Sequence, residues 1–353
     1  MTADFRKKVE DIKRLAAGRT FRLMEVCGTH TVAISRFGIR QILTPEIELI
    51  SGPGCPVCVT PAEYVAKALY LAHGGFLVAT FGDMMKVPVN ETSLFDARAE
   101  GADVRVVYSP LDAVKIAAEN PDKQVVFLGV GFETTAPTIA GAIKSAFENE
   151  VKNFSVLCGV KTIPVPLEII SASPEIAVDG FILPGHVSAI IGAKPYRFLA
   201  EKFGIPGVIT GFEAEDIIDG VWRLAKLIAA EQAEIQISYT RVVMPEGNIA
   251  AQRLIDEVFE PCDSDWRGIG RLPNSGLRIR EKFARYDAQR RFDIPSFPDA
   301  RDNPACQCDK VIMGRIKPPE CPLFGEICTP QHPQGPCMIS SEGACAAYYK
   351  YSL

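Results

Sequence analysis

The sequence lacks the features that mark several classes of protein. No apolar run in its 353 residues reaches the roughly 18 that a membrane-spanning helix requires. Residues 1–15 are charged and have no apolar stretch of the signal-peptide kind, so they predict an amphipathic helix in a cytoplasmic protein. Basic residues do not predominate, and a formal net charge of −5 argues against a nucleic-acid-binding surface, which needs clustered lysine and arginine.

The composition is that of a globular protein, but it includes many cysteines. Hydrophobic residues make up 47% and charged residues 23% of the chain, and this length predicts two or three domains. Eleven cysteines in a reducing compartment are not expected to act as disulfide staples. The cysteines therefore direct attention to metal binding and redox chemistry.

The stretch Gly52-Pro-Gly-Cys-Pro-Val-Cys58 places two cysteines on a turn after an apolar run, residues 47–50, that predicts a buried strand. Thr60, Pro61 and Glu63 predict a capped helix directly after the pair. A helix N-terminus stabilises a thiolate, so Cys55 and Cys58 are candidates for a redox-active or metal-binding dithiol. The alternative is a pair that only packs or holds a structural zinc ion.

A second candidate follows the predicted strand 21–26, where Cys27-Gly-Thr-His30 begins. The carboxyl end of a strand is the usual place for chemistry in an open α/β sheet. A thiolate and an imidazole together suit iron, copper or zinc. Alternatively, Cys27 is a buried thiol and His30 a surface residue.

The second half of the chain carries two further polar turns after predicted strands. Glu133 lies between threonines in Gly131-Phe-Glu-Thr-Thr135, and His186 lies in Pro184-Gly-His-Val-Ser188. Both suggest polar groups placed against a ligand, although His186 could instead cap a helix. Gly129 and Gly131 do not make a dinucleotide-binding motif, because the third glycine and the acidic residue at the end of a following strand are missing.

The two halves also resemble each other. A strand, a glycine turn, a helix and a strand lead from Gly54 to Asp83, and the same order leads from Gly185 to Glu213. This predicts two similar α/β domains of the βαβ type that face each other across a cleft. Chance similarity between βαβ units is the alternative, since such spacing is common.

After these units the pattern changes twice. Residues 213–232 and 246–259 predict amphipathic helices, and the arginine-rich residues 267–291 predict a mostly solvated helix face. Six of the eleven cysteines then lie between Cys306 and Cys345, among prolines and glycines. Cys306, Cys321, Cys328 and Cys345 are candidates for a [4Fe–4S] cluster or a zinc site, and the lack of paired zinc knuckles favours the cluster. The surplus Cys308 and Cys337 could substitute as ligands.

Taken together, the motifs resemble the signature motifs of the HypD family of hydrogenase maturation factors. The resemblance rests on the two cysteine motifs, on the Glu133 and His186 motifs, and on the C-x14-C-x6-C-x16-C spacing of the tail. It spans nearly the whole chain. It implies two similar α/β domains, residues 19–118 and 119–212, and a mostly helical, cysteine-rich iron–sulfur domain formed by residues 213–353 with 1–18.

The resemblance also implies a function. Members of the family act with a HypC-type chaperone as a scaffold for the Fe(CN)₂CO unit of [NiFe]-hydrogenases, and the cyanide comes from a HypE-type partner. The counterpart of Cys27 would hold this transient iron, and Cys55 and Cys58 would relay electrons between the [4Fe–4S] cluster and the iron. His30, Glu133 and His186 would supply hydrogen bonds or protons.

Two other classes of function fit part of the pattern. A cluster-dependent thiol–disulfide reductase would use Cys55 and Cys58 but would give no role to the Cys27 and His186 motifs. A structural iron–sulfur or zinc protein would use only the tail. We therefore expect a redox-active assembly scaffold rather than a stand-alone enzyme.

Overall fold

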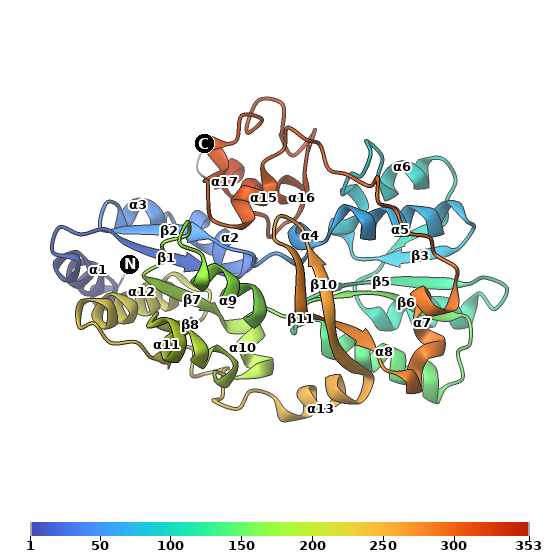
Figure 1. Cartoon of the computed structure of the whole chain (residues 1–353), viewed down its shortest axis with the longest axis horizontal. Helices are drawn as coiled ribbons and strands as arrows, with labels where there is room; N and C mark the ends of the chain where they lie inside the picture. The colour runs from blue at the N-terminus through green and yellow to red at the C-terminus, as the bar shows by residue number, and fades with distance from the viewer. Residues whose placement is uncertain (1, 352–353) are drawn as a thin grey trace.

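The computed structural model describes residues 2–351 and contains two separate parallel sheets. Met1, Ser352 and Leu353, which belong to the expected third domain, lie outside the described residues. The first sheet has the strand order β2-β1-β7-β8-β9 and the second has the order β4-β3-β5-β6. Figure 1 shows the first sheet in the left half of the molecule and the second in the right half.

All strand pairs of the first sheet are parallel, and the sheet packs against helices from two separate parts of the chain. Its strands are β1 (Phe21–Glu25), β2 (Ile47–Ser51), β7 (Gly180–Pro184), β8 (Gly207–Thr210) and β9 (Ile235–Ile237). The helices beside it are α1 (Ala3–Ala16), α2 (Gly28–Arg36), α3 (Ile39–Leu43), α10 (Gly185–Ile191), α11 (Arg197–Phe203) and α12 (Ala214–Ala229). The expected amphipathic helices at residues 1–15 and 213–232 are therefore confirmed as α1 and α12.

The second sheet is also parallel, and every residue of its central strand β5 (Val125–Gly131) is buried. Such a continuous apolar strand is typical of a parallel sheet with helices on both faces. The other strands are β3 (Leu77–Thr80), β4 (Val104–Val106) and β6 (Phe154–Val160). The helices are α5 (Ala62–His73), α6 (Leu94–Ala99), α7 (Pro110–Glu119), α8 (Ala136–Glu148) and α9 (Pro164–Ala172), with a 3₁₀ turn η1 (Gly82–Lys86).

The two sheets do not follow the expected division of the chain at residue 118. Strands β1 and β2 pair with β7, β8 and β9, whereas β3 and β4 pair with β5 and β6. The chain thus crosses from the first sheet to the second after β2 and returns after β6. The expected internal repeat is wrong for the same reason: β7 and β8 are neighbours in one sheet, whereas β2 and β3 belong to different sheets. Local sequence spacing could not reveal this, because it does not specify which strands pair.

The segment after the first sheet contains a β-hairpin where a helix was expected. After α13 (Ile249–Val258), strands β10 (Phe259–Trp266) and β11 (Gly270–Ile279) pair antiparallel. The expected helix at residues 246–259 is confirmed within a few residues, but the expected arginine-rich helix is wrong over β11. Alternate burial along β10 shows the two-residue period of a strand. Residues 281–291 then form η3 (Glu281–Tyr286) and α14 (Ala288–Arg291).

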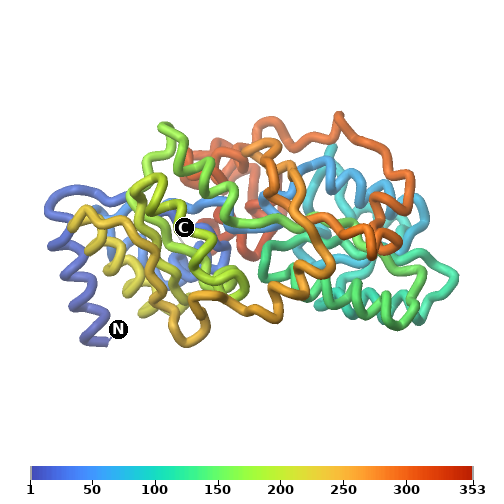
Figure 2. The backbone as a smooth tube through the Cα atoms, turned by 60° about the horizontal axis from the view of Figure 1, so that its bottom comes forward, coloured from blue at the N-terminus to red at the C-terminus, as the bar shows by residue number. Residues whose placement is uncertain are grey.

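The cysteine-rich tail lies across the junction of the two sheets. Its elements are short: α15 (Cys308–Ile312), η4 (Pro318–Glu320), α16 (Pro336–Ile339) and α17 (Ala344–Tyr351). Figure 1 shows α15, α16 and α17 above the region where the two halves meet, and Figure 2 shows the same red segment near the middle of the molecule. The tail is therefore placed to contact turns from both sheets.

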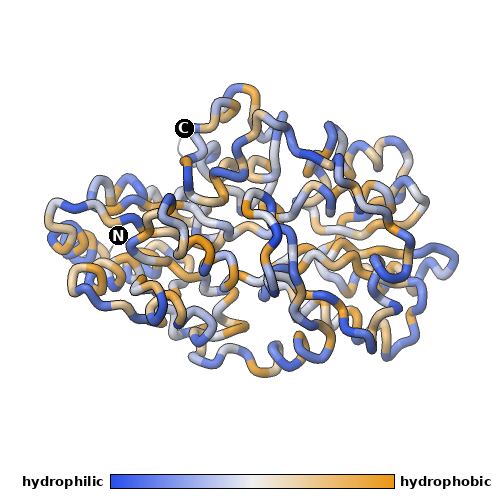
Figure 3. Tube along the Cα trace, viewed as in Figure 1, coloured by the Kyte–Doolittle hydropathy of each residue, from blue (hydrophilic) through white to orange (hydrophobic). Residues whose placement is uncertain are grey.

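Hydrophobic residues are concentrated in the strands and in the inward faces of the helices, whereas several outer loops are hydrophilic (Figure 3). Within residues 2–351, no helix is both long and apolar enough to cross a membrane.

Candidate redox and metal site

The turn that carries Cys27 contacts the turn that carries Cys55. The N–H of Gly28 donates to the carbonyl oxygen of Gly54 over 3.0 Å, and the N–H of Gly52 donates to the carbonyl oxygen of Glu25 over 2.8 Å. A Cβ atom on Gly54 would lie only 2.2 Å from the backbone nitrogen of Cys27. Glycine is required at this position because the two backbones approach so closely. The sheet pairing of β1 with β2 brings these two turns to the same edge.

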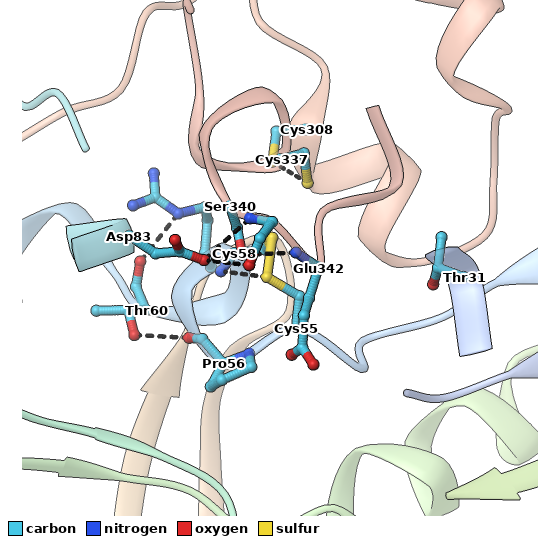
Figure 4. Close-up of a disulfide and its surroundings, with 12 residues drawn as sticks. Thr31, Cys55, Pro56, Cys58, Thr60, Asp83, Cys308, Cys337, Ser340 and Glu342 are labelled. Atoms are coloured by element: carbon cyan, nitrogen blue, oxygen red, sulfur yellow. Dashed lines mark hydrogen bonds between the residues drawn. A yellow bond between two sulfur atoms is a disulfide. The ribbon is translucent and has the colours of Figure 1, made fainter. Parts of the chain in front are cut away.

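Cys55 and Cys58 are joined by a disulfide at a one-turn helix, α4 (Pro56–Val59) (Figure 4). Cys55 is the N-cap of this helix, and the N–H of Cys58 donates to the Cys55 Sγ over 3.1 Å. The expected capping of the next helix by Thr60 is wrong: α5 begins at Ala62, and the Thr60 hydroxyl donates to the carbonyl oxygen of Pro56. Cys55 thus caps the short helix α4, and the cysteine pair does not lie at the N-terminus of α5.

The Cys27 thiol is buried at the N-terminus of α2. Burial raises the pKa of Cys27 to about 12, and the nearby charge of Glu342 acts in the same direction. The backbone N–H groups of His30 and Thr29 oppose this shift but do not cancel it. The free side chain is therefore a thiol at neutral pH, and a bound cation would have to displace its proton.

His30 is fully buried, contrary to the alternative that placed it on the surface. Its Nε2 lies 2.9 Å from both the Gly211 carbonyl oxygen and the Thr210 Oγ1, whereas its Nδ1 has no partner. Burial lowers the pKa of His30 to about 4, so the ring is neutral at pH 7. With the proton on Nε2, the Nδ1 atom presents a free lone pair.

His186 joins this group through an aromatic ring. Phe212 packs against His30 with the ring centroids 4.6 Å apart and against His186 with the centroids 4.0 Å apart. His186 itself is solvent-exposed at the start of α10. The turns after β1, β7 and β8 therefore bring both predicted histidines to one edge of the first sheet.

Glu133 approaches from the other sheet. Its Oε1 accepts a 3.0 Å hydrogen bond from the N–H of Ile163, and its buried Oε2 has no partner. Burial raises the pKa of Glu133 to about 7. Among the described residues no hydrogen bond joins Glu133 to Cys27, His30 or His186. Burial raises the pKa of the Tyr196 phenol, and the charges of Glu133 and Cys27 act in the same direction.

The sequence reasoning missed Glu25, a fully buried carboxylate beside Cys27. Its Oε2 accepts a 3.1 Å hydrogen bond from the N–H of Cys27, and its Oε1 accepts one of 2.5 Å from the Thr31 hydroxyl. Burial raises the pKa of Glu25 to about 7, against the effect of these hydrogen bonds. The sequence did contain a signal for this residue, because an acidic side chain ends an apolar strand two positions before Cys27.

The reasoning also missed Glu342, which the tail brings to the same place. Its Oε1 accepts a 2.8 Å hydrogen bond from the Thr29 hydroxyl, and it borders a small pocket with Cys55, Cys58 and Cys337. Figure 4 shows the Glu342 side chain beside the disulfide. The segment is anchored by Asp83, whose Oδ2 accepts hydrogen bonds from the side chain of Ser340 and from the backbone and side chain of Ser341.

The six tail cysteines gather around one pocket, lined by Cys306, Cys308, Cys321, Cys328, Cys337 and Cys345. A Cβ atom on Gly335 would lie 2.6 Å from the Cys306 Sγ, so a side chain at this position would have to displace the Cys306 sulfur. Within residues 2–351, no three histidine, cysteine or acidic side chains are arranged to hold one metal ion. A [4Fe–4S] cluster places its four thiolates on four different irons, so its ligands need not converge on one ion. The donor set and the pocket therefore fit such a cluster.

Cys308 and Cys337 form a close pair inside this group, with Cys308 Sγ 2.7 Å from Cys337 Sγ. Cys337 lines both the tail pocket and the small pocket that contains the Cys55–Cys58 disulfide. Figure 4 shows the Cys308–Cys337 pair next to that disulfide. The surplus cysteines of the tail therefore lie between the predicted cluster ligands and the disulfide.

Comparison with known proteins gives consistent matches along the chain. Residues 3–352 match the family model described as "HypD: Hydrogenase formation hypA family". The chain is 46% identical over 343 residues to the Hydrogenase maturation factor HypD of Cupriavidus necator, which covers 95% of this chain and 90% of that protein. It is 44% identical over 339 residues to the protein of the same name from Escherichia coli, with 95% and 90% covered. It is 42% identical over 348 residues to a putative hydrogenase expression/formation protein of Methanocaldococcus jannaschii, with 98% and 96% covered.

Proposed function

The chain belongs to the HypD family of hydrogenase maturation factors, and from this premise we propose that it is a scaffold on which the Fe(CN)₂CO unit of [NiFe]-hydrogenases is assembled. A HypC-type chaperone would share the scaffold, and a HypE-type protein would donate the cyanide. The observation that carries the proposal is the backbone contact between the Cys27 turn and the Cys55 turn. It supports the proposal because it holds Cys27, a candidate soft ligand for iron, near Cys55 and Cys58, the candidate redox-active pair.

Cys27 is the proposed ligand of the iron that is being assembled. A thiolate is a soft donor that suits low-spin Fe(II) with strong-field ligands. The raised pKa of the free thiol means that iron binding releases its proton. The unpartnered Nδ1 of His30, three residues along α2, can accept a hydrogen bond or a proton beside this site. Glu133 and His186 are proposed to act at the edge of the same site.

The tail is proposed to hold a [4Fe–4S] cluster through Cys306, Cys321, Cys328 and Cys345. When bound, this cluster would supply electrons one at a time. The gathering of the tail thiols around one pocket and the close approach of Gly335 to the Cys306 sulfur support this assignment. Cys308 and Cys337 are then free to act as a second cysteine pair.

The cysteine pairs are proposed to carry electrons toward the iron site. Cys55 and Cys58 take up two electrons and two protons as their S–S bond breaks, and they give up both when the bond forms again. Glu342 is a carboxyl group close enough to exchange such protons, since it borders the pocket that holds both sulfurs. Cys308 and Cys337 lie next to this pocket and are positioned to exchange electrons with the pair.

The test is infrared spectroscopy of the chain purified anaerobically with its small partner. The wild type should show cyanide bands, and Cys27→Ala should lose them while keeping about four tail-bound irons. Cys158→Ala is the matched control, because Cys158 is a free cysteine that lines a different pocket. Unchanged cyanide bands in Cys27→Ala would remove the proposed role of Cys27.

The same preparations test the alternative function. A cluster-dependent thiol–disulfide reductase would turn over a disulfide substrate without any partner, and its activity would survive Cys27→Ala but not Cys55→Ala. The fully buried His30 and the contact between the Cys27 and Cys55 turns favour the scaffold, because a reductase needs neither.

A further inference from the structure

Glu25 ends β1 at the point where the two cysteine turns meet, and its side chain is fully buried. Its backbone carbonyl oxygen accepts a 2.8 Å hydrogen bond from the N–H of Gly52, at the start of the turn that carries Cys55. Its Oε2 accepts a 3.1 Å hydrogen bond from the N–H of Cys27. One residue therefore contacts the backbone of both turns.

The second oxygen of this carboxylate is held by the helix that follows Cys27. Glu25 Oε1 accepts a 2.5 Å hydrogen bond from the hydroxyl of Thr31, near the start of α2. The same hydroxyl lies 3.4 Å from the carbonyl oxygen of Cys27. Cys27 is the N-cap residue of α2, but its own side chain makes no capping hydrogen bond. The carboxylate of Glu25 thus ties the backbone of Cys27 to the first residues of the helix.

These hydrogen bonds separate two roles that a carboxylate beside a metal ligand can have, which are to bind the metal itself or to orient the ligand. Both carboxylate oxygens of Glu25 already accept hydrogen bonds from its own turn and helix. The buried Oε2 of Glu133 and Nδ1 of His30, by contrast, have no partner. The contacts therefore indicate that Glu25 acts on the site through Cys27 and does not touch the iron.

We propose that Glu25 is a positioning residue, whose carboxylate fixes the backbone of Cys27 and so holds the Cys27 sulfur where the iron binds. This inference rests on the proposed function, in which Cys27 is the iron ligand. A ligand that is already fixed loses less conformational entropy on binding, and groups that orient a metal ligand commonly change metal affinity by about 10- to 100-fold. Because Glu25 also bonds to Gly52, it keeps this sulfur beside the turn of Cys55.

The first measurement is the rate at which iodoacetamide alkylates Cys27, followed by peptide mass spectrometry. The full-length chain is expressed without its small partner and purified anaerobically. In Glu25→Ala the backbone of Cys27 loses its acceptor, and Cys27 should react about tenfold faster than in the wild type. Glu25→Gln keeps an acceptor for this N–H, so its rate should stay within about twofold of the wild type. Cys158, a free cysteine in a different pocket, is the internal control: its rate should not change, whereas a general loss of stability would raise both rates.

The second measurement is the infrared cyanide signal of the chain purified with its small partner. Glu25→Ala should lower this signal per chain about tenfold and keep about four tail-bound irons. Glu25→Gln should retain most of the signal. Glu148→Ala, which removes an exposed acidic side chain of α8, is the control and should match the wild type.

Thr31→Val covers the case in which Glu25→Ala does not fold. It removes only the hydroxyl that holds Oε1, so the reaction of Cys27 should still accelerate relative to that of Cys158. A wild-type rate at Cys27 in whichever of the two variants folds would overturn the inference. Equal loss of cyanide in Glu25→Gln and Glu25→Ala would overturn it too, because Glu25 would then be a ligand of the iron. The proposed function is judged separately, by whether the wild type carries cyanide bands that Cys27→Ala lacks.

Discussion

The N–H of Gly28 donates a 3.0 Å hydrogen bond to the carbonyl oxygen of Gly54, and this bond joins two turns that follow different strands of one sheet. The residue before Gly28 is the proposed iron ligand, and the residue after Gly54 is half of the disulfide. Because backbone atoms make the contact, side-chain motion cannot separate the two turns. The distance between the iron site and the cysteine pair is thus set by the pairing of β1 with β2.

Gly54→Ala tests this contact. The added Cβ would lie 2.2 Å from the backbone nitrogen of Cys27, so one of the turns must move. Such overpacking should lower the free energy of unfolding by about 1–3 kcal/mol, measured by urea titration, and should weaken the cyanide bands of the purified complex. Gly141→Ala, in α8 with open space around it, should instead raise the stability by about 0.5–1 kcal/mol. Equal stability of Gly54→Ala and the wild type would show that the turns can separate freely.

Asp83→Ala tests how the tail is held at the site. The variant loses three hydrogen bonds that Asp83 Oδ2 accepts from Ser340 and Ser341. We expect a loss of about 1–3 kcal/mol of stability and faster hydrogen exchange in residues 340–343, measured by mass spectrometry. The exposed Asp122→Ala is the control. Unchanged exchange in this segment would mean that other contacts of the tail are sufficient to hold Glu342.

Glu133→Gln tests the pH dependence of a buried carboxyl group. Burial raises the pKa of Glu133 from its ordinary value near 4.5 to about 7 in the folded protein. Its contribution to stability is therefore fully present below about pH 4.5 and is lost as the pH rises through 7. Glutamine stays neutral, so its stability relative to the wild type should improve by about 2–3 kcal/mol between pH 5 and pH 8. A pH-independent difference in urea unfolding would contradict a raised pKa.

The tail cysteines can be sorted by single serine substitutions. Cys345→Ser should lose most of the iron and the visible absorption of the cluster, because a cluster ligand is removed. Cys308→Ser and Cys337→Ser should keep both, because these two sulfurs pair with each other. Iron analysis and the absorption spectrum of anaerobically purified protein provide the measurement. Loss of iron in Cys308→Ser but not in Cys306→Ser would exchange these two residues in the ligand assignment.

Much of the local structure could be predicted from the sequence because it depends on nearby residues. The apolar strands at residues 21–26 and 47–50 lie where the patterns predicted them. The helix predicted for the arginine-rich segment was wrong over β11, which is held as a strand by antiparallel pairing with β10. The predicted start of α5 was wrong because the Thr60 hydroxyl donates to the Pro56 carbonyl oxygen in the short preceding helix instead of capping α5.

The sequence by itself determined which chemical groups this protein has and the family to which it belongs, because ordered motifs such as Cys27-Gly-Thr-His30 are properties of the chain. Only the tertiary structure decided which strands pair. As a result, β1 and β2 join the sheet of β7 and not that of β3. The tertiary structure also brought Glu342 to Cys55 and Cys58 from a distant segment. The physical reason is that sheet pairing and the docking of the tail depend on contacts between residues far apart in the chain, and local periodicity carries no information about such contacts.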